Sequence, residues 1–355
     1  MFSVPTEIQL SLAPTRRFQA IDVTQVVSEE RGDVLGHYRR ALYCSMHSTA
    51  GYLDQSLATR LEHRHDLLHQ FFDAFRAVFP PGASYRHDQM HLRAELSAEQ
   101  RVVEPPNADS HLTFIGAGLR NCVTYRNQPA APVYFIDLDG TFQGTQRQRN
   151  TTIVAYNEER VVAQATAEVP VSRHPLDAIN LADPRFGIID AANDLLARCG
   201  LAKGRVDLLL DSEENDAGLT VNEYETLLMK HDLVEVLRNP LKYAKEKSRH
   251  ILDDPLSVPS KTIAYARYDV VRGLNSLMEA LRVDQSVVER IVAEVMAYPA
   301  RRLLRSRKVT FLATDECGDG RPRLVRGTYQ SPILIQWKPA ERQARRIVIA
   351  VSQLY

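Results

Sequence analysis

The chain has 355 residues, of which 44% are hydrophobic and 25% charged, a composition typical of a globular protein with room for two domains. Its 44 basic side chains balance 44 acidic ones, which argues against a nucleic-acid-binding protein that depends on a strongly positive surface. No apolar run approaches the ~20 residues of a transmembrane helix, and no signal peptide is recognisable. We therefore expect a cytoplasmic protein without nucleic-acid or membrane partners.

The cysteines and histidines differ in how they are distributed. The four cysteines are widely spaced and form no Cys-x-x-Cys pair, which favours reduced, buried thiols over a cysteine-based zinc site. Eight of the 11 histidines precede residue 112. This bias predicts that the chemistry of the chain lies in its N-terminal half.

Two stretches of the chain repeat one order of patterns. From residue 6, and again from residue 161, a strand-like run, a proline-containing turn and a second short alternating run precede an apolar strand. Each apolar strand ends in a polar cluster and Ala-Gly, at His47 to Gly51 and at Glu214 to Gly218. Repeats of this length indicate a tandem duplication, in which Glu214 stands where the first copy has His47.

Helical patterns follow in both copies, and each contains a His-Asp pair. In the first copy the apolar stripe comprises Leu57, Leu61, Leu68, Phe72 and Phe75. His65 falls on this stripe, so we expect it at a buried pocket wall. His231 falls on the stripe of the second copy, where a hydrogen-bonded core histidine is the simpler interpretation.

Both copies are expected to end in strands, near the similar tetrapeptides Gly140-Thr-Phe-Gln143 and Gly327-Thr-Tyr-Gln330. We place the domain boundary near Asn157, which gives domains 1–157 and 158–355. The second domain contains extra residues from about 239 to 295. Their pattern predicts two amphipathic helices, which we interpret as a packing or oligomer-contact insertion.

The first copy resembles the YjbQ-like proteins, a family often described as secondary thiamine-phosphate synthase enzymes. Five motifs in the family's order carry the resemblance: His47-Ser-Thr-Ala50, His65-Asp66, Tyr85-Arg-His87, Asn107-Ala-Asp-Ser-His111 and Gly140-Thr-Phe-Gln143. The second copy keeps Asn222-Glu223, His231-Asp232 and Gly327 to Gln330, but has Glu214 for the first histidine and Arg301 for the last.

The resemblance implies an α+β fold with two tandem YjbQ-like domains, each a mixed or antiparallel sheet packed with helices, the second domain being degenerate. It also implies a transferase resembling thiamine-phosphate synthase. Family members are thought to form trimers, so the resemblance implies a homo-oligomer.

The motif histidines suggest a metal centre if the fold brings them together. Three neutral imidazoles suit Zn²⁺ or Fe²⁺ and leave an open position for water or substrate. We expect His47, His65 and His111 as ligands, with His87 as the acid/base group or a fourth ligand. Asp66 could orient a different histidine, and Gln143 could donate to an oxyanion or simply form a tight turn. Asp137 and Asp139 lie on one face of a strand as a further carboxylate pair.

Three functions follow from this reading. The first is a metal-assisted enzyme acting on a small polar metabolite, with or without a phosphate group, at one active site per chain that the second copy or another chain could complete. The second is an Fe²⁺-dependent oxidative enzyme, and the third is a non-catalytic ligand-binding or scaffold protein. Dinucleotide-binding, P-loop and serine-hydrolase motifs are missing from the sequence.

Overall fold

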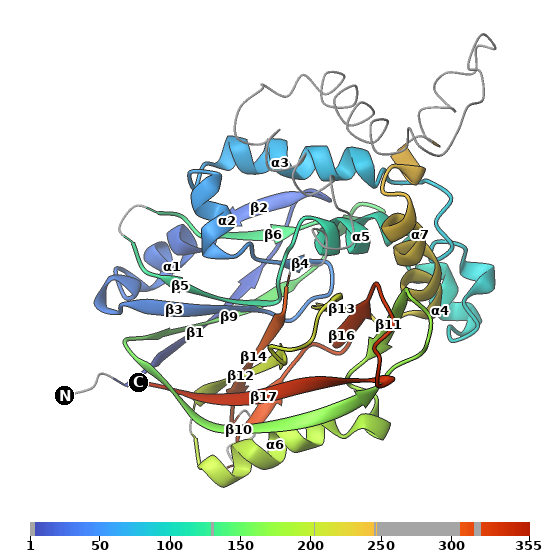
Figure 1. Cartoon of the computed structure of the whole chain (residues 1–355). Coiled ribbons are helices and arrows are strands. Elements are labelled where there is room, and N and C mark those ends of the chain that lie inside the picture. The colour runs from blue at the N-terminus through green and yellow to red at the C-terminus, as the bar shows by residue number, and fades with distance from the viewer. Residues whose placement is uncertain (1–3, 129–130, 202, 245, 247–305, 316–320) are drawn as a thin grey trace. The chain divides into compact units, whose positions relative to one another are not determined.

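The computed structural model describes residues 4–128, 131–201, 203–244, 246, 306–315 and 321–355 (Figure 1). Two compact units divide the chain. Unit 1 comprises Met1–His63, Gly118–Tyr224 and Leu304–Tyr355, and unit 2 comprises Arg64–Ala117 and Glu225–Leu303. Each unit therefore takes segments from both halves of the sequence. The proposed duplication boundary near Asn157 lies in the turn between strands β9 (Arg149–Tyr156) and β10 (Glu159–Pro170) of unit 1 and stays a prediction.

The first half of unit 1 contains two antiparallel sheets. The larger sheet has the strand order β1-β9-β3-β5 (Thr6–Leu12, Arg149–Tyr156, Arg40–Ser45, Cys122–Arg126), and the smaller has the order β2-β6-β4 (Gln19–Asp22, Tyr134–Asp137, Ala50–Gly51). Helices α1 (Val23–Arg31) and α2 (Gln55–Arg60) follow β2 and β4, and β7 (Thr141–Phe142) pairs with β8 (Thr145–Gln146).

The second half of unit 1 repeats the strand order of both sheets and adds one strand, β15 (Arg323–Val325), to the edge of the larger sheet. Its larger sheet has the order β10-β17-β12-β14-β15 (Glu159–Pro170, Ala344–Leu354, Lys203–Leu210, Lys308–Thr314, Arg323–Val325). Its smaller sheet has the order β11-β16-β13 (Asp177–Asn180, Ser331–Gln336, Ala217–Asn222). Helix α6 (Ile188–Cys199) follows β11, as α1 follows β2.

The strand registers of the two halves also correspond. In the first half Gln19 and Ala50 both pair with Asp137, and in the second half Asp177 and Ala217 both pair with Gln336. The Ala-Gly pairs singled out in the sequence thus lie opposite the same positions of β6 and β16. The two halves share one strand order and one register in their small sheets.

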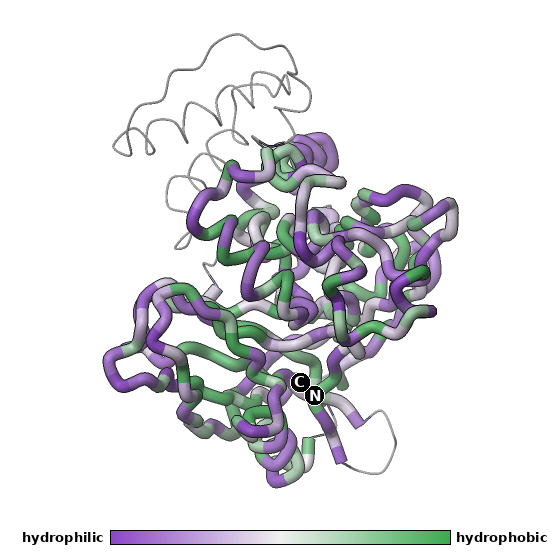
Figure 2. Tube along the Cα trace, turned by 90° about the vertical axis from the view of Figure 1, so that its right-hand side faces the viewer, coloured by the Kyte–Doolittle hydropathy of each residue, from purple (hydrophilic) through white to green (hydrophobic). Residues whose placement is uncertain are grey.

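Strand β3 shows how the core of unit 1 is built. Its side chains alternate between two faces, as in any strand. Ala41 and Tyr43 pack into a cluster within the first half, while Leu42 and Cys44 pack with Leu312 and Leu354 from the second half. Both faces of β3 are buried, which agrees with the unbroken apolar run from Ala41 to Cys44. Figure 2 shows hydrophobic residues along the strands and hydrophilic residues in the turns that join them.

Unit 2 consists of helices in the described ranges: α3 (His65–Val78), α4 (Ala98–Val103), α5 (Ala108–Gly116) and α7 (Leu233–Arg238), with short turns η2 (Met90–Leu92) and η4 (Leu228–Asp232). Helix α3 buries Leu68, Phe71, Phe72 and Phe75 at helical spacing. Residues 247–295 of the expected insertion lie outside the described residues.

The structure confirms the predicted α+β class, since antiparallel sheets and helices are both well represented. None of the helices in the described ranges has the length and hydropathy of a membrane-spanning segment.

Candidate functional site

His47 lies in the turn that follows β3 in unit 1, as the sequence predicts. The backbone N–H of Asn150 donates to its Nε2 over 2.9 Å, and Arg149 Nη1 lies 3.5 Å from its Nδ1. Burial lowers the pKa of His47 to about 4, with the positive charges of Arg149 and Arg147 adding to the effect. His47 is therefore a neutral imidazole at neutral pH, and both of its ring nitrogens face N–H donors.

Arg149 is held by two aspartates of the FIDLDG segment. Its Nε and Nη2 donate to Asp137 over 2.7 and 3.0 Å, and Nη2 also donates to the backbone oxygen of Asp139 over 2.7 Å. The carboxylate of Asp139 pairs instead with Arg147, at 3.1 Å. Asp137 and Arg149 are both buried, so Asp137 anchors Arg149, and the two carboxylates of the predicted pair bind different arginines.

Arg345 occupies the same position in the second half of unit 1. Its Nε donates to Gln336 Oε1 over 3.3 Å and its Nη2 to the backbone oxygen of Lys338 over 2.8 Å. Its Nη1 donates to Glu214 Oε2 over 2.9 Å, and the backbone N–H of Arg346 donates to Glu214 Oε1 over 2.8 Å. Glu214 thus makes the contacts in the second half that His47 makes in the first.

Three residues of the second half hold the His47 turn within unit 1. Gln330 donates from Nε2 to the backbone oxygens of Ser45 and His47, over 2.9 Å each, and is buried. Asn222 Nδ2 donates to the backbone oxygen of Ser48 over 3.0 Å. Gly327 lies so close that a Cβ there would be 1.8 Å from the oxygen of Met46. The turn that presents His47 is therefore fixed by both halves.

The structure corrects the expected match between the two tetrapeptides. Gly327 to Gln330 precede β16, whereas Gly140 to Gln143 follow β6, although β6 and β16 correspond. Gln143 (φ 48°) and Gly144 (φ 78°) form the exposed two-residue loop between β7 and β8, in the left-handed conformation of a type I′ hairpin. Gln143 thus forms the tight turn that the sequence allows, and a catalytic role for it stays a prediction.

The expected burial of His65 is wrong, because His65 is exposed at the start of α3. The apolar stripe assumed one continuous helix, but Glu62 and His63 have positive φ angles of 55° and 53° that separate α2 from α3. The helical phase therefore restarts at His65. The Nε2 atom of His65 lies 3.1 Å from Nε2 of His69. The carboxylate of Asp66 forms an ion pair with Arg64 at 2.5 Å.

His87 lies at the centre of a buried polar cluster in unit 2. Its Nδ1 is 3.1 Å from Glu225 Oε2, and its Nε2 is 3.2 Å from Asn107 Oδ1. Glu225 also accepts the backbone N–H groups of Leu227 and Leu228, over 2.7 Å each. Burial alone would raise the pKa of Glu225, but these hydrogen bonds outweigh it and lower that pKa. Glu225 is thus an anion hydrogen-bonded to the imidazole.

Asp232 positions the main chain that carries His87. It accepts the backbone N–H groups of Arg86 and His87 and the hydroxyl of Tyr243, each over 3.0 Å. The rings of Tyr243 and Tyr85 pack with centroids 4.3 Å apart. A segment from the second half of the sequence therefore orients a histidine from the first half, inside one compact unit.

His111 and Asp88 complete the cluster. The rings of His111 and His87 have centroids 5.3 Å apart at 74°. Asp88 Oδ1 accepts the backbone N–H of Ala108 at the start of α5, while Asn107, the N-cap residue, turns its amide toward His87. Burial raises the pKa of Asp88 to about 6, and nearby carboxylates contribute to the increase.

The structure thus brings together two of the predicted site residues, His87 and His111. The sequence alone does not identify the residues that surround these two histidines, which are Glu225, Asn107, Asp88 and Asp232. Asn107 and Asp232 do belong to the motifs that resemble the family. The expected metal ligand His47 lies in unit 1, while His65 and His111 lie in unit 2. Within the described ranges, no three His, Cys, Asp or Glu side chains lie where they could hold a metal ion. His87 offers both ring nitrogens to oxygen atoms, so it does not fit as a fourth ligand in this arrangement.

Comparisons with known proteins found similar solved structures. No family model and no curated protein matches the chain. A YbjQ-like protein of unknown function from Sulfolobus solfataricus P2 aligns with 55% of this chain and 99% of its own, at 14% identity and a TM-score of 0.28. A hypothetical protein from Aeropyrum pernix K1 aligns with 53% and 96%, at 13% identity and a TM-score of 0.28. An uncharacterized conserved protein of the YjbQ/UPF0047 family from Clostridium acetobutylicum aligns with 53% and 99%, at 13% identity and a TM-score of 0.25.

Proposed function

We propose that this chain is an enzyme that performs acid–base chemistry on a small polar metabolite, with His87 of unit 2 as the group that transfers the proton. The observation that carries the proposal is the placement of the His87 imidazole between Glu225 and Asn107, while Asp232 fixes its backbone. A general acid or base held by an orienting carboxylate is a recurrent arrangement in enzymes.

The contacts of His87 assign a role to each ring nitrogen. Glu225 accepts from Nδ1–H, which leaves Nε2 as the nitrogen that exchanges a proton. With Asn107 Oδ1 facing Nε2, both nitrogens act as donors, which suits the imidazolium. Rotation of the carboxamide by half a turn would present its NH₂ group to a neutral Nε2. Asn107 can therefore partner His87 before and after proton transfer.

Asp88 gives the cluster a second group that can change its charge near neutral pH. Burial, with a smaller contribution from the charges of Asp109 and Asp232, raises the pKa of its carboxyl to about 6. A carboxyl of this kind donates or accepts protons more effectively near neutrality than an ordinary aspartate. Together His87 and Asp88 supply an acid and a base within one buried cluster.

We also infer that the chain arose by tandem duplication. The matched strand orders and the matched contacts around Arg149 and Arg345 support this origin. In this view the first copy kept the histidines and the second kept the supporting frame, while also supplying Glu225 and Asp232 to unit 2. The two copies thus share one site.

The test of function is a turnover screen of the full chain against matched pairs of phosphorylated and unphosphorylated metabolites. His87→Gln should lower kcat by about 100-fold or more, since general acid–base catalysis contributes factors of that size. The control is His91→Gln, which changes an exposed histidine of the same segment. Circular dichroism of both variants verifies folding. A folded His87→Gln enzyme with wild-type kcat contradicts the proposal.

The same preparation distinguishes the other functions that the sequence suggested. A zinc or iron centre at His47, His65 and His111 stays a prediction, which elemental analysis of wild type beside His47→Ala would test. Iron together with oxygen consumption would favour the oxidative enzyme. A non-catalytic binding protein would show metabolite binding without turnover, and His87→Gln would change affinity alone.

A further inference from the structure

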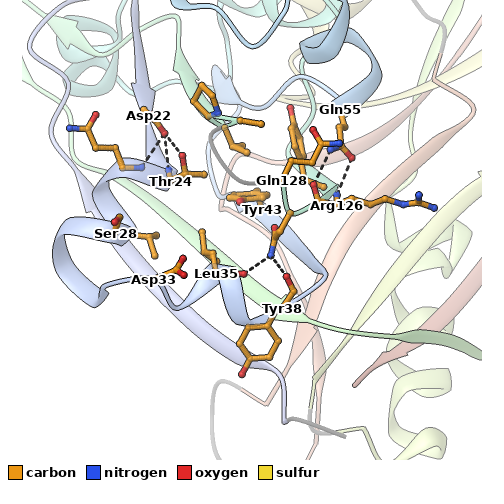
Figure 3. Close-up of a pocket in the computed structure, with 18 of the residues that line it drawn as sticks. Asp22, Thr24, Ser28, Asp33, Leu35, Tyr38, Tyr43, Gln55, Arg126 and Gln128 are labelled. Atoms are coloured by element: carbon orange, nitrogen blue, oxygen red, sulfur yellow. Dashed lines mark hydrogen bonds between the residues drawn. The ribbon is translucent and has the colours of Figure 1, made fainter.

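A cavity of about 530 Å³ opens in unit 1 beside α1 (Figure 3). Its walls come from α1 and the turn after it, from β3 and β5, and from the segment that follows β5. This volume lies within the range of pockets that enclose small molecules. All of the lining residues belong to unit 1, whereas the His87 cluster belongs to unit 2.

Two carboxylates give the cavity an acidic side. Asp22 caps α1 through Oδ1 alone, which accepts from the backbone N–H groups of Thr24 and Gln25 and from the Thr24 hydroxyl. Its Oδ2 makes no hydrogen bond with any described residue. Asp33 makes no ion pair within the described ranges, and its carboxylate lies over Gly36, where a Cβ would be 2.4 Å from Oδ1. Both carboxylates keep the capacity to receive a cationic group.

The charge of the cavity is uneven. Among the described lining residues, Arg126 is the only one with a full positive charge. Figure 3 shows its guanidinium group directed away from Asp22 and Asp33. The region around the two carboxylates therefore has a negative charge that no lining cation neutralises.

Tyr43 supplies a polar group on the apolar wall. The residue is 1% exposed, it lines the cavity, and its hydroxyl makes no hydrogen bond with any described residue. Burial raises the pKa of this hydroxyl and the charge of Asp22 adds to the increase, so it stays protonated. Its ring packs edge-on against Tyr125, with centroids 5.6 Å apart. Because Tyr43 lines the cavity, its hydroxyl is reached from the cavity and is open to a hydrogen bond with a ligand there.

The positions in the second half of unit 1 that correspond to Tyr43 and Tyr125 carry no hydroxyl group. The strand registers match Tyr43 with Leu208 and Tyr125 with Phe311. Helix α6 has 12 residues and buries Ile188, Ala192 and Leu196, whereas α1 has nine and buries only Val23 and Val27. The second half thus has apolar side chains where the first has two tyrosines beside a shorter helix.

We propose that the cavity beside α1 binds a small protonated amine. The ammonium group would lie between Asp22 and Asp33, the Tyr43 hydroxyl would accept one of its N–H groups, and the apolar part of the ligand would contact Val27, Leu35 and Val133. Carboxylates beside tyrosine rings are a common environment for organic cations, because the ring faces also attract positive charge.

The test is calorimetric titration of the full chain with three probes of one shape: 2-phenylethylamine, 2-phenylethanol and phenylacetate. We expect the amine to bind at least about tenfold more tightly than the alcohol, and phenylacetate not to bind. Asp22→Asn should weaken amine binding roughly tenfold while preserving α1, because asparagine caps helices as well as aspartate does. Asp33→Asn should act in the same direction.

The control variant is Asp190→Asn, which removes an exposed carboxylate from the first turn of α6, the corresponding helix of the second half. It should leave amine binding unchanged. Equal binding of the alcohol and the amine, no amine binding at about 10 mM, or unchanged amine binding in the Asp22→Asn/Asp33→Asn double variant would each overturn the proposal. Turnover at His87 is not part of this readout, so the two proposals fail independently.

Discussion

The two arginine sites of unit 1 can be exchanged by two substitutions. His47→Glu together with Asp137→Gln gives Arg149 the partners that Arg345 has, since Glu214 and Gln336 occupy the corresponding positions. Both backbone contacts of the site remain, because Asn150 N–H and the oxygen of Asp139 are unaffected. If the two halves of unit 1 hold their arginines in equivalent surroundings, the double variant should have nearly the stability of the wild type, although the single variant Asp137→Gln is clearly less stable.

The magnitudes follow from the burial of the pair. Asp137 is fully buried and Arg149 is 4% exposed. Asp137→Gln leaves this guanidinium without a carboxylate and should cost about 3 kcal/mol, at the low end for a broken buried ion pair because glutamine still accepts a hydrogen bond. His47→Glu alone adds a second carboxylate to the same arginine and should change the stability by less than about 1 kcal/mol. In the double variant the introduced glutamate restores the ion pair, so we expect a coupling free energy of about 2 kcal/mol.

Urea unfolding followed by tryptophan fluorescence measures the four free energies of the cycle. The chain has one tryptophan, Trp337, which follows β16 in unit 1 and donates to Asp216 over 3.1 Å. Its signal therefore reports on the unit that contains both arginine sites. If the losses of the single variants simply add in the double variant, with coupling below about 0.5 kcal/mol, the correspondence between His47 and Glu214 is not energetic and the reasoning fails.

Three further predictions concern individual residues. The pKa of His47 falls from 6.5 to about 4 on folding, so the unfolding free energy should drop by about 3 kcal/mol as pH falls from 6.5 to 4, and His47→Gln should abolish that part of the drop in urea titrations at several pH values. Gly327→Ala should destabilise unit 1 by more than about 3 kcal/mol in the same fluorescence assay, because its Cβ would lie 1.8 Å from a backbone oxygen, whereas Gly144→Ala should cost only about 1 kcal/mol through its positive φ. Asp88→Asn should raise the unfolding free energy at pH 8 by up to about 3 kcal/mol, measured by circular dichroism. The reason is that the native pKa of Asp88, about 6, lies above the ordinary 3.8, so the ionised carboxylate opposes folding at pH 8. An unchanged unfolding free energy at pH 8 would contradict the raised pKa.

The fold features that sequence predicted correctly are local. The apolar strand before His47, the turn that presents it and the Ala-Gly pair that follows could be recognised because strand patterns and short spacings carry this information. The match between His47 and Glu214 rests on the same logic, since both precede an Ala-Gly pair that is fixed by its partner strand. The order of residues within these short segments is enough to predict the strand, the turn and the Ala-Gly pair.

Residue similarity and hydrophobic periodicity do not correspond to the structure at two places in this chain. The two similar tetrapeptides lie at opposite ends of corresponding strands: Gly140 to Gln143 follow β6, whereas Gly327 to Gln330 precede β16. The stripe that included His65 crossed a break of two positive φ angles, which a hydrophobic pattern does not reveal. Glu225 is 138 residues from His87, so only the folded structure shows that they form a pair.

The difference between the two arginine sites bears on function. Glu214 offers an oxygen to Arg345 and another to a backbone N–H, at 2.9 and 2.8 Å, whereas His47 has one lone pair for two facing donors. For the frame alone, glutamate is the better partner of an arginine. The first half nevertheless has an imidazole that is held neutral in a turn fixed by Gln330 and Gly327. A residue that fits its structural role less well than its counterpart in the same chain is what a functional requirement produces, because sites of chemistry are where local stability is given up. His47→Glu should therefore lose turnover while keeping its stability, and turnover equal to that of the wild type would contradict this argument.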